Sequence, residues 1–413
     1  MMIEPFTDLL SEHLNGPDPP NCAIIDVMIP WAHQPCKQFN IPTISFFTSS
    51  ACSASVEFAI DKLSPDNLTA GDLLPRLPEF IRVSLTDMIH WAPPPHHHSQ
   101  LEPMSGPPPR SGPGRQPSWV SETESSIALL INTWDDLERP CVDYLRKEVK
   151  KPIFCVGPLL PEEFSKTVGS TVQDSVMRSK RDQSTYSEKE INEWLDTKPR
   201  GSVIYVAFGS EVGPSKDELA DLAVALDECN RPFIWVIQSG PNRHGPRPSR
   251  GPHGGPTRPP KSTNMDMDLD GFVERVKGRG LILCGWAPQL LILSHSSTGG
   301  FISHGGWNST LEAILRGVPL LTWPIRGDQH YNAKLIMEHF KVGLIIKGDD
   351  NQIEGFKKDD ILQGIEKLMV DENIRKHANL LANMFEHELS GSYKASLDAF
   401  NSFMNQIEIA REK

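Results

Sequence analysis

The sequence predicts an α/β protein with two doubly wound, Rossmann-like domains, each built on a parallel β-sheet. Its length of 413 residues exceeds that of a typical domain and suits two. After residue 201, short apolar runs alternate with helical patterns, which is typical of a parallel sheet with helices on both faces. A shorter series of apolar runs between residues 22 and 159 predicts a second, smaller sheet.

We assign residues 1–165 to an N-terminal domain, 166–200 to a linker and 201–413 to a C-terminal domain whose last helix packs back on the first domain. The N-terminal strands are expected at Cys22–Asp26, Ile41–Thr48, Ile127–Asn132 and Ile153–Leu159. Helices are expected at Met1–Gly16, Trp31–Phe39 and Trp134–Lys147. Polar composition and weak periodicity indicate the linker.

The C-terminal domain shows the clearer alternation. Its strands are expected at Ser202–Ser210, Pro232–Gln238, Leu281–Cys284, Gly300–Ser303, Pro319–Trp323 and Gly343–Ile346, with a helix at Lys216–Glu228. Parallel sheets of this kind bind ligands outside the carboxyl ends of their strands.

Two segments rich in Pro and Gly, 93–117 and 240–261, interrupt the pattern, and we expect both to be insertions without packed structure. His96–His98 leave a metal site as an alternative, although three adjacent side chains cannot all face one ion. The five basic residues of 240–261 leave a nucleic-acid or anionic partner as an alternative. The role of either insertion stays open.

Composition restricts the class of protein. The net charge of −12 disfavours non-specific binding to nucleic acid or acidic membranes. Seven cysteines without a CxxC pair indicate reduced thiols in a cytoplasmic protein, with no zinc site. We see no signal peptide and no run of about 20 apolar residues. No transmembrane segment is therefore expected, and peripheral membrane association stays open.

Between residues 286 and 329 the polar side chains suggest a ligand pocket. The strand ending at Ser303 runs into His304-Gly305-Gly306, and a helix is expected to open near Asn308 and Ser309, one of which would cap it. Free N–H groups and the helix dipole make such a turn an anion site.

Flanking groups would extend this pocket. Trp286 follows a strand and could stack on a flat base, while Asp328 and Gln329 follow the next strand and suit sugar hydroxyls. A nucleotide-sugar pocket accounts for all of these residues. A helix cap, a core tryptophan and a polar loop that are merely neighbours remain the alternative.

The segment from Trp286 to Gln329 resembles the signature of plant family 1 UDP-glycosyltransferases, the secondary-product glycosyltransferases. The matching residues are Trp286, Ala287, Pro288, Gln289, His304, Gly306, Trp307, Asn308, Ser309, Glu312, Pro319, Asp328 and Gln329. Segments 132–138, 156–159 and 208–210 also resemble family segments. The resemblance covers the chain from about residue 21 onward, apart from the two insertions, and implies a fold of the GT-B type.

The resemblance implies roles for these residues. Trp286 would stack on uracil and Ala287 would bind the edge of the base, while Gln289 and Glu312 would hold the ribose hydroxyls. Residues expected at the diphosphate are Ser210, His304, Asn308 and Ser309. Residues expected at the sugar are Trp307, Asp328 and Gln329, and glutamine at the last position implies glucose. Gly305 stands where the family usually has cysteine, which should loosen the turn and modestly weaken donor binding.

The implied reaction needs UDP-glucose as co-substrate and neither a cofactor nor a metal. A hydroxyl of a phenolic, flavonoid or terpenoid acceptor displaces UDP, with inversion at the anomeric carbon. Asp26 matches the family's aspartate that orients a histidine base. That histidine is not found, because neither His13 nor His33 matches its position.

We therefore expect a truncated N-terminal domain, with an edge or apolar face of its sheet left uncovered. The alternative function is that of a non-catalytic UDP-sugar-binding protein or a regulatory partner of full-length relatives. The acceptor and the oligomeric state cannot be read from the sequence.

Overall fold

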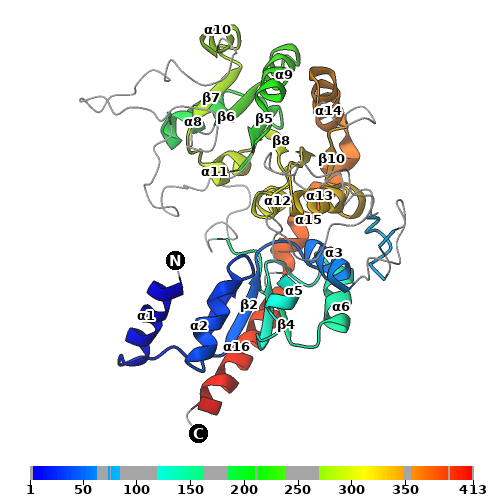
Figure 1. Cartoon of the computed structure of the whole chain (residues 1–413). Coiled ribbons are helices and arrows are strands. Elements are labelled where there is room, and N and C mark those ends of the chain that lie inside the picture. Colours follow the sequence, from blue (N-terminus) through cyan, green and yellow to red (C-terminus); the bar gives the residue numbers. More distant parts are fainter. Residues whose placement is uncertain are drawn as a thin grey trace, which may run out of the picture. The chain divides into compact units, whose positions relative to one another are not determined.

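A computed structural model describes residues 3–62, 73–74, 76–83, 119–160, 185–209, 213–237, 269–347, 355–388 and 391–411. The chain divides into two compact units (Figure 1). Unit 1 comprises Met1–Leu159, Arg326–Tyr331 and His387–Lys413, and unit 2 comprises Leu160–Ile325 and Asn332–Glu386. Both insertions, 93–117 and 240–261, lie outside the described residues.

Unit 1 is built on a parallel sheet of the order β1-β2-β3-β4. Its strands are β1 (Ala23–Asp26), β2 (Thr43–Phe47), β3 (Ala128–Ile131) and β4 (Ile153–Cys155). The two central strands are almost wholly buried, as their continuous apolar sequences predict for a sheet covered on both faces.

The helices of unit 1 are α1 (Ile3–Leu14), α2 (His33–Gln38), α3 (Ala51–Lys62), α5 (Trp119–Glu122), α6 (Arg139–Glu148) and α16 (Ser392–Arg411), with a 3₁₀ turn at Pro30–Ala32. Pro35 does not break α2 because it lies in the first turn, where its missing N–H has no partner to lose. Helix α6 was expected to begin at Trp134 but begins at Arg139. Pro140 then lies in the first turn of α6, where proline is favourable.

The C-terminal helix α16 packs against β4 within unit 1 (Figure 1). The ring of Phe154 lies 5.5 Å from that of Phe400 and 5.3 Å from that of Phe403. The backbone N–H of Cys155 donates to Ser396 Oγ at 2.9 Å. Aromatic packing and one buried hydrogen bond therefore join the end of the chain to the fourth strand.

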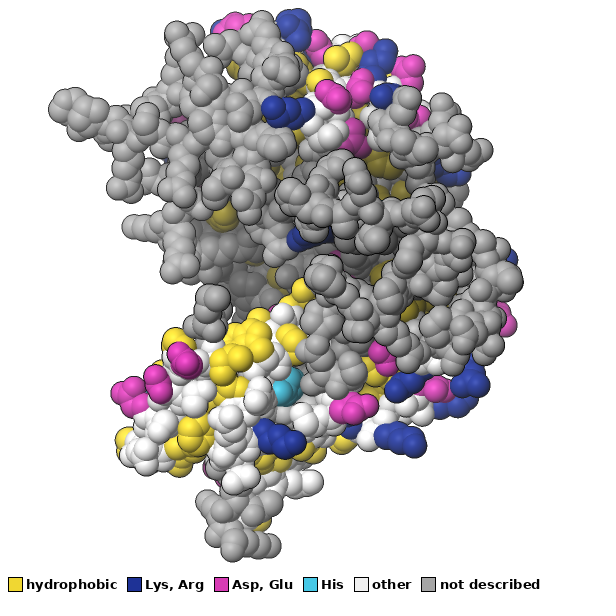
Figure 2. Space-filling view, in the orientation of Figure 1, with side chains coloured by type: hydrophobic (Ala, Val, Ile, Leu, Met, Phe, Trp, Pro, Cys, Tyr) yellow, Lys and Arg dark blue, Asp and Glu magenta, His cyan; other side chains and the backbone are white. Residues whose placement is uncertain are grey.

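β1 lies at the edge of its sheet, and the apolar side chains near it are unusually exposed. Ile24 is 52% exposed and Met28 is 59% exposed. Exposed Ile3 and Leu9 of α1 add to this surface, and Figure 2 shows hydrophobic side chains gathered around α1 and α2. The described residues of unit 1 thus leave an apolar surface beside an edge strand.

Unit 2 is built on a parallel sheet of the order β10-β9-β8-β5-β6-β7. Its strands are β5 (Val203–Ala207), β6 (Phe233–Ile237), β7 (Gly280–Cys284), β8 (Thr298–Ser303), β9 (Leu320–Thr322) and β10 (Gly343–Ile345). Its core joins this sheet to helices α9 (Lys216–Glu228), α10 (Leu269–Arg275) and α14 (Lys358–Val370). Buried side chains such as Leu226, Trp235, Phe272 and Ile365 form this core.

The helices of unit 2 are α8 (Glu188–Asp196), α9 (Lys216–Glu228), α10 (Leu269–Arg275), α11 (Gln289–Ser294), α12 (Trp307–Ile314), α14 (Lys358–Val370) and α15 (Glu372–Glu388). Helix α13 (Asp328–Lys334) runs across the boundary of the two units and continues into a π-helical segment, Leu335–Phe340. Part of the segment expected as a linker forms α8, which Ser187 and Glu190 cap reciprocally.

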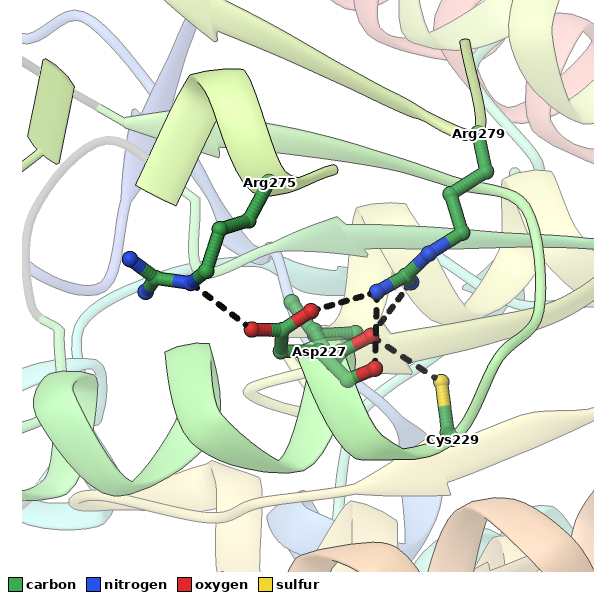
Figure 3. Close-up of polar contacts among 5 residues, drawn as sticks. Asp227, Cys229, Arg275 and Arg279 are labelled. Carbon is green, nitrogen blue, oxygen red and sulfur yellow. Dashed lines mark hydrogen bonds and ion pairs between the residues drawn. The ribbon is translucent and has the colours of Figure 1, made fainter. Parts of the chain in front are cut away.

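Arg279 satisfies the carbonyl groups at the end of α9 (Figure 3). Its guanidinium donates to the carbonyl oxygens of Leu226 at 2.8 Å and Asp227 at 2.7 Å, and to the Asp227 carboxylate at 2.6 Å. Arg275 donates to the other oxygen of that carboxylate at 3.0 Å. These contacts fix the start of β7 against α9, because Arg279 immediately precedes the strand.

The predicted fold class is confirmed, since both units are α/β with wholly parallel sheets. Every strand expected from the sequence is present. The largest relative difference in length is at the strand expected at Ile153–Leu159, which ends at Cys155. Pro158, which has no N–H to donate, cannot continue a sheet ladder.

Candidate functional site

The carboxyl ends of β5, β7 and β8 in unit 2 carry most of the residues that the sequence singled out. Because neighbouring parallel strands end at the same edge, the segments that follow them are brought together. These segments are Gly209 after β5, Trp286–Gln289 after β7 and His304–Ser309 after β8.

Gln289 joins two of these segments through its side-chain amide. Its Nε2 donates to Glu312 Oε2 at 2.6 Å and to Ser309 Oγ at 3.0 Å. Its Oε1 accepts from the hydroxyl of Tyr205, on β5, at 3.1 Å. Glu312 is 3% exposed, so its carboxylate is held in place by a short bond in a sheltered position.

The imidazole of His304 lies against two glycines. A Cβ added at Gly209 would lie 2.7 Å from His304 Nε2, and one added at Gly306 would lie 2.4 Å from the same atom. Gly209 also has a φ of +68°, a conformation that disfavours other residues. Only glycine at both positions lets the ring lie this close to the backbone.

The turn between β8 and α12 is held at both backbone groups of Gly305. Its N–H donates to Ser303 Oγ at 3.2 Å, and its carbonyl accepts from Asn332 Nδ2 at 3.0 Å. Its φ of +78° suits glycine. The expected loosening of this turn stays a prediction, because both bonds are made by backbone groups and do not depend on the residue type.

The capping prediction for α12 needs correction. The helix begins at Trp307, and its N-cap is Gly306, with no side-chain hydrogen bond to the cap. Ser309 already lies within the first turn, where its hydroxyl instead accepts from Gln289. Asn308 is exposed in the same turn. Neither residue therefore caps the helix.

The other predicted residues of unit 2 are placed around this turn. Trp286 is partly buried in the segment after β7, and Ala287 and Trp307 are buried. Ser210 lies outside the described residues.

Asp328 and Gln329 belong to unit 1. Ser49, which follows β2, donates its hydroxyl to Asp328 Oδ2 at 2.6 Å. Gln329 is buried, and its Oε1 accepts from the backbone N–H of Arg326 at 3.0 Å. Both side chains at the start of α13 are therefore fixed by hydrogen bonds.

A second carboxyl group lies near Asp328. Burial first, and then the negative charge of Asp328, raise the pKa of Glu57 to about 7, although a hydrogen bond from Ser53 opposes this rise. The Ser53 hydroxyl donates to Glu57 Oε1 at 3.3 Å. Glu57 is thus partly protonated near neutral pH.

Glu138 performs a structural task in unit 1. Its carboxyl oxygens accept from the N–H groups of Ala51 at 3.0 Å and Cys52 at 2.8 Å, at the N-terminus of α3. The side chain is fully buried, and burial raises its pKa to about 7 although these bonds lower it.

Asp26, the predicted orienting carboxylate, ends β1. Its Oδ1 accepts from the backbone N–H of Met28 at 2.8 Å, and no histidine pairs with it among the residues that the structure describes. His33 is buried and contacts Thr43 Oγ1 at 3.0 Å through Nδ1. Burial lowers the pKa of His33, and the charge of Lys151 lowers it further.

His13 is exposed in the last turn of α1. The described part of the chain also holds no cluster of His, Cys, Asp and Glu side chains able to bind a metal ion, and no helix in it is long and apolar enough to cross a membrane. His96–His98 lie outside the described residues.

Sequence reasoning missed three supporting residues, namely Tyr205, Ser49 and Asn332. Tyr205 carried a signal, since a tyrosine in an otherwise aliphatic buried strand needs a partner for its hydroxyl. No comparable pattern marks Ser49 or Asn332.

The comparisons with known proteins show the family of this chain. A family model described as "UDP-glucoronosyl and UDP-glucosyl transferase" matches residues 179–388. Scopoletin glucosyltransferase from Nicotiana tabacum is 31% identical over 380 residues, covering 90% of this chain and 70% of the relative. UDP-glycosyltransferase 73B3 from Arabidopsis thaliana is 29% identical over 402 residues, covering 94% and 74%.

Solved structures show the same fold. A UDP-glucosyltransferase from Polygonum tinctorium, capable of glucosylating indoxyl and solved in complex with 3,4-dichloroaniline, superposes with a TM-score of 0.71 at 25% identity. The match covers 98% of this chain and 80% of that one.

Proposed function

Because the chain belongs to the family of UDP-glucoronosyl and UDP-glucosyl transferases, we propose that it transfers glucose from UDP-glucose to a hydroxyl of a small plant secondary metabolite. The acceptor is a phenolic, flavonoid or terpenoid, and the anomeric carbon is inverted. The fold is of the GT-B type, as in the plant glycosyltransferases that it resembles. General glycosyl transfer follows from the family, whereas this sugar, this acceptor class and this stereochemistry are our proposal.

The bonded set of Gln289, Ser309 and Glu312 carries the proposal. It places an amide, a hydroxyl and a carboxylate together beside the N-terminus of α12. We assign Gln289 and Glu312 to the ribose hydroxyls, with Trp286 and Ala287 at the uracil. His304, Asn308, Ser309 and Ser210 are assigned to the diphosphate, because the N-terminus of a helix attracts anions.

We assign Trp307, Asp328 and Gln329 to the glucose. A carboxylate and an amide suit paired sugar hydroxyls because together they offer both acceptors and donors. The fixed positions of Asp328 and Gln329 support this assignment, since side chains already held by hydrogen bonds lose little freedom when a ligand binds.

In the proposed reaction the acceptor oxygen attacks the anomeric carbon as the bond to UDP breaks, and the acceptor proton must leave. We assign Asp26 to orienting a histidine base, and because no histidine pairs with Asp26 among the described residues, the proton passes to solvent. Loss of a general base typically costs about 10²–10⁴ in rate. Phenols, with a pKa near about 10, suffer less from such a loss than aliphatic alcohols and are therefore our preferred acceptors.

A second function is favoured by the contacts of Asp26, which pairs with no histidine among the described residues. In this reading the chain binds UDP-sugar without turnover and acts as a regulatory partner of active relatives.

One experiment separates the two functions. The purified chain is incubated with labelled UDP-glucose and a panel of phenols, and UDP binding is measured by calorimetry on the same sample. We expect UDP binding and a labelled glucoside. UDP binding without any glucoside supports the second function, and a folded chain that does not bind UDP overturns both.

A further inference from the structure

We propose that Ser49 is a positioning residue for the donor sugar and acts by orienting the carboxylate of Asp328. This inference rests on the proposed function, because it assigns Asp328 to the hydroxyls of glucose. It concerns a residue outside the segment 286–329, in the turn between β2 (Thr43–Phe47) and α3 (Ala51–Lys62).

The contact itself is short and charge-assisted. Ser49 Oγ lies 2.6 Å from Asp328 Oδ2, within the range expected for a hydroxyl that donates to a carboxylate. Hydrogen bonds to charged groups are among the stronger ones in proteins. A carboxylate accepts about four hydrogen bonds, so this bond is compatible with additional bonds from two sugar hydroxyls.

The position of Ser49 is itself fixed by its neighbours. The next residue, Ser50, is buried and accepts from the backbone N–H of Ser53 at 3.0 Å, which starts α3. Glu138 accepts from the N–H groups of Ala51 and Cys52 in the same turn. The hydroxyl of Ser49 therefore reaches Asp328 from a rigid helix start, which limits how far the carboxylate can rotate.

The neighbouring acid strengthens the need for this bond. Glu57 lies in α3, one turn after Ser53. The negative charge of Asp328 is one of the causes that raise the pKa of Glu57. Ser53 donates to Glu57 and Ser49 donates to Asp328, so each of the two acids has its own serine. Without the Ser49 hydroxyl, the Asp328 carboxylate would still be repelled by Glu57 but would lose a hydrogen bond that orients it.

The test compares two ligands that differ only in the sugar. UDP and UDP-glucose are titrated into the full chain by calorimetry, and the ratio of their dissociation constants measures what the sugar contributes. Ser49→Ala is expected to weaken the binding of UDP-glucose about tenfold, which is typical for loss of a hydrogen bond to a charged group. The affinity for UDP should stay unchanged. Ser49→Thr keeps the hydroxyl and is expected to restore most of the ratio.

A matched control is Ser55→Ala, which removes a serine hydroxyl from α3, the helix that follows Ser49. Ser55 donates to the backbone carbonyls of Ala51 and Cys141 and not to Asp328. It should lower stability without changing the ratio. An unchanged ratio in Ser49→Ala, or equal weakening of UDP and UDP-glucose, overturns the inference. Failure of the wild-type chain to bind UDP would instead refute the proposed function.

Discussion

Gln289 Nε2 donates to Glu312 Oε2 at 2.6 Å, which joins the first turn of α11 to the second turn of α12. Both residues are assigned to the ribose of the donor, and here they are bonded to each other. The site is therefore pre-organised, because binding adds hydroxyls to a pair whose geometry already exists.

This pair gives the first prediction. Gln289→Ala and Glu312→Gln should each weaken UDP binding about tenfold or more, because each removes a partner of a buried, hydrogen-bonded group. The double variant should lose less than the product of the two effects, since contacting residues are energetically coupled. Calorimetric titration with UDP measures all three variants. Gln363→Ala, at an exposed position on α14, is the control, and full additivity would contradict the coupling.

The second prediction concerns Gly209 and His304. Gly209→Ala adds a methyl group 2.7 Å from the imidazole at a φ of +68°. The left-handed conformation alone costs about 1–2 kcal/mol, and the displaced ring should weaken UDP binding. Urea unfolding and UDP titration measure the two effects. Gly213→Ala is the matched control, because nothing lies within 4 Å of its added Cβ. Unchanged UDP affinity in Gly209→Ala would count against His304 as a diphosphate ligand.

The third prediction is a pH dependence of stability. Burial raises the pKa of Glu57 to about 7 from an ordinary value of 4.5. Between these values the folded chain holds a proton that the unfolded chain has released, so the stability contributed by this group is lost as pH rises toward 7. Relative to Glu57→Gln, the wild type should become less stable from pH 5 to pH 8. Exposed Glu79→Gln controls for the change of charge. A difference between wild type and Glu57→Gln that does not vary with pH would refute this account.

A fourth prediction tests the contacts of Figure 3. Arg279→Lys should lower the free energy of unfolding by about 1–3 kcal/mol, because lysine carries its donors on one nitrogen and cannot reproduce the two-nitrogen fork that reaches both carbonyls and the carboxylate. Arg275→Lys, which alters one exposed bond to the same aspartate, should cost less than about 1 kcal/mol. Equal losses in urea unfolding would show that the fork geometry of Arg279 does not matter.

The fifth prediction concerns residues 240–261, which lie outside the described residues. If this basic segment is only an insertion, a chain lacking it should bind UDP with unchanged affinity. A filter-binding assay with single- and double-stranded nucleic acid, run on both chains, tests the competing idea. Nucleic-acid binding that disappears with the segment would support that alternative.

The strands and the grouping of site residues could be predicted because both depend on local sequence. Apolar runs mark β5, β7 and β8, and parallel strands place the residues after them at one edge. The cap of α12 was predicted wrongly because Asn308 and Ser309 are favourable N-cap residues, and the sequence does not show that the helix already starts at Trp307, with Gly306 as its N-cap.

The contacts that support the site could not be predicted. Ser49 and Asp328 are separated by 279 positions, and neither has a pattern that names the other. Asn332 and Gly305 are likewise joined only by the way the chain returns after β9. Such pairs depend on tertiary packing, which a single sequence does not encode in any local signal.

The central claim is that this chain transfers glucose with inversion, and proton NMR of one reaction mixture tests it most directly. The chain is incubated with UDP-glucose, whose glucose is α-linked, and with a phenol. We predict that UDP is released in equal amount to a new glucoside whose anomeric proton shows the large coupling of a β-linkage. An α-linked product, or UDP release without a glucoside, would contradict the proposed reaction.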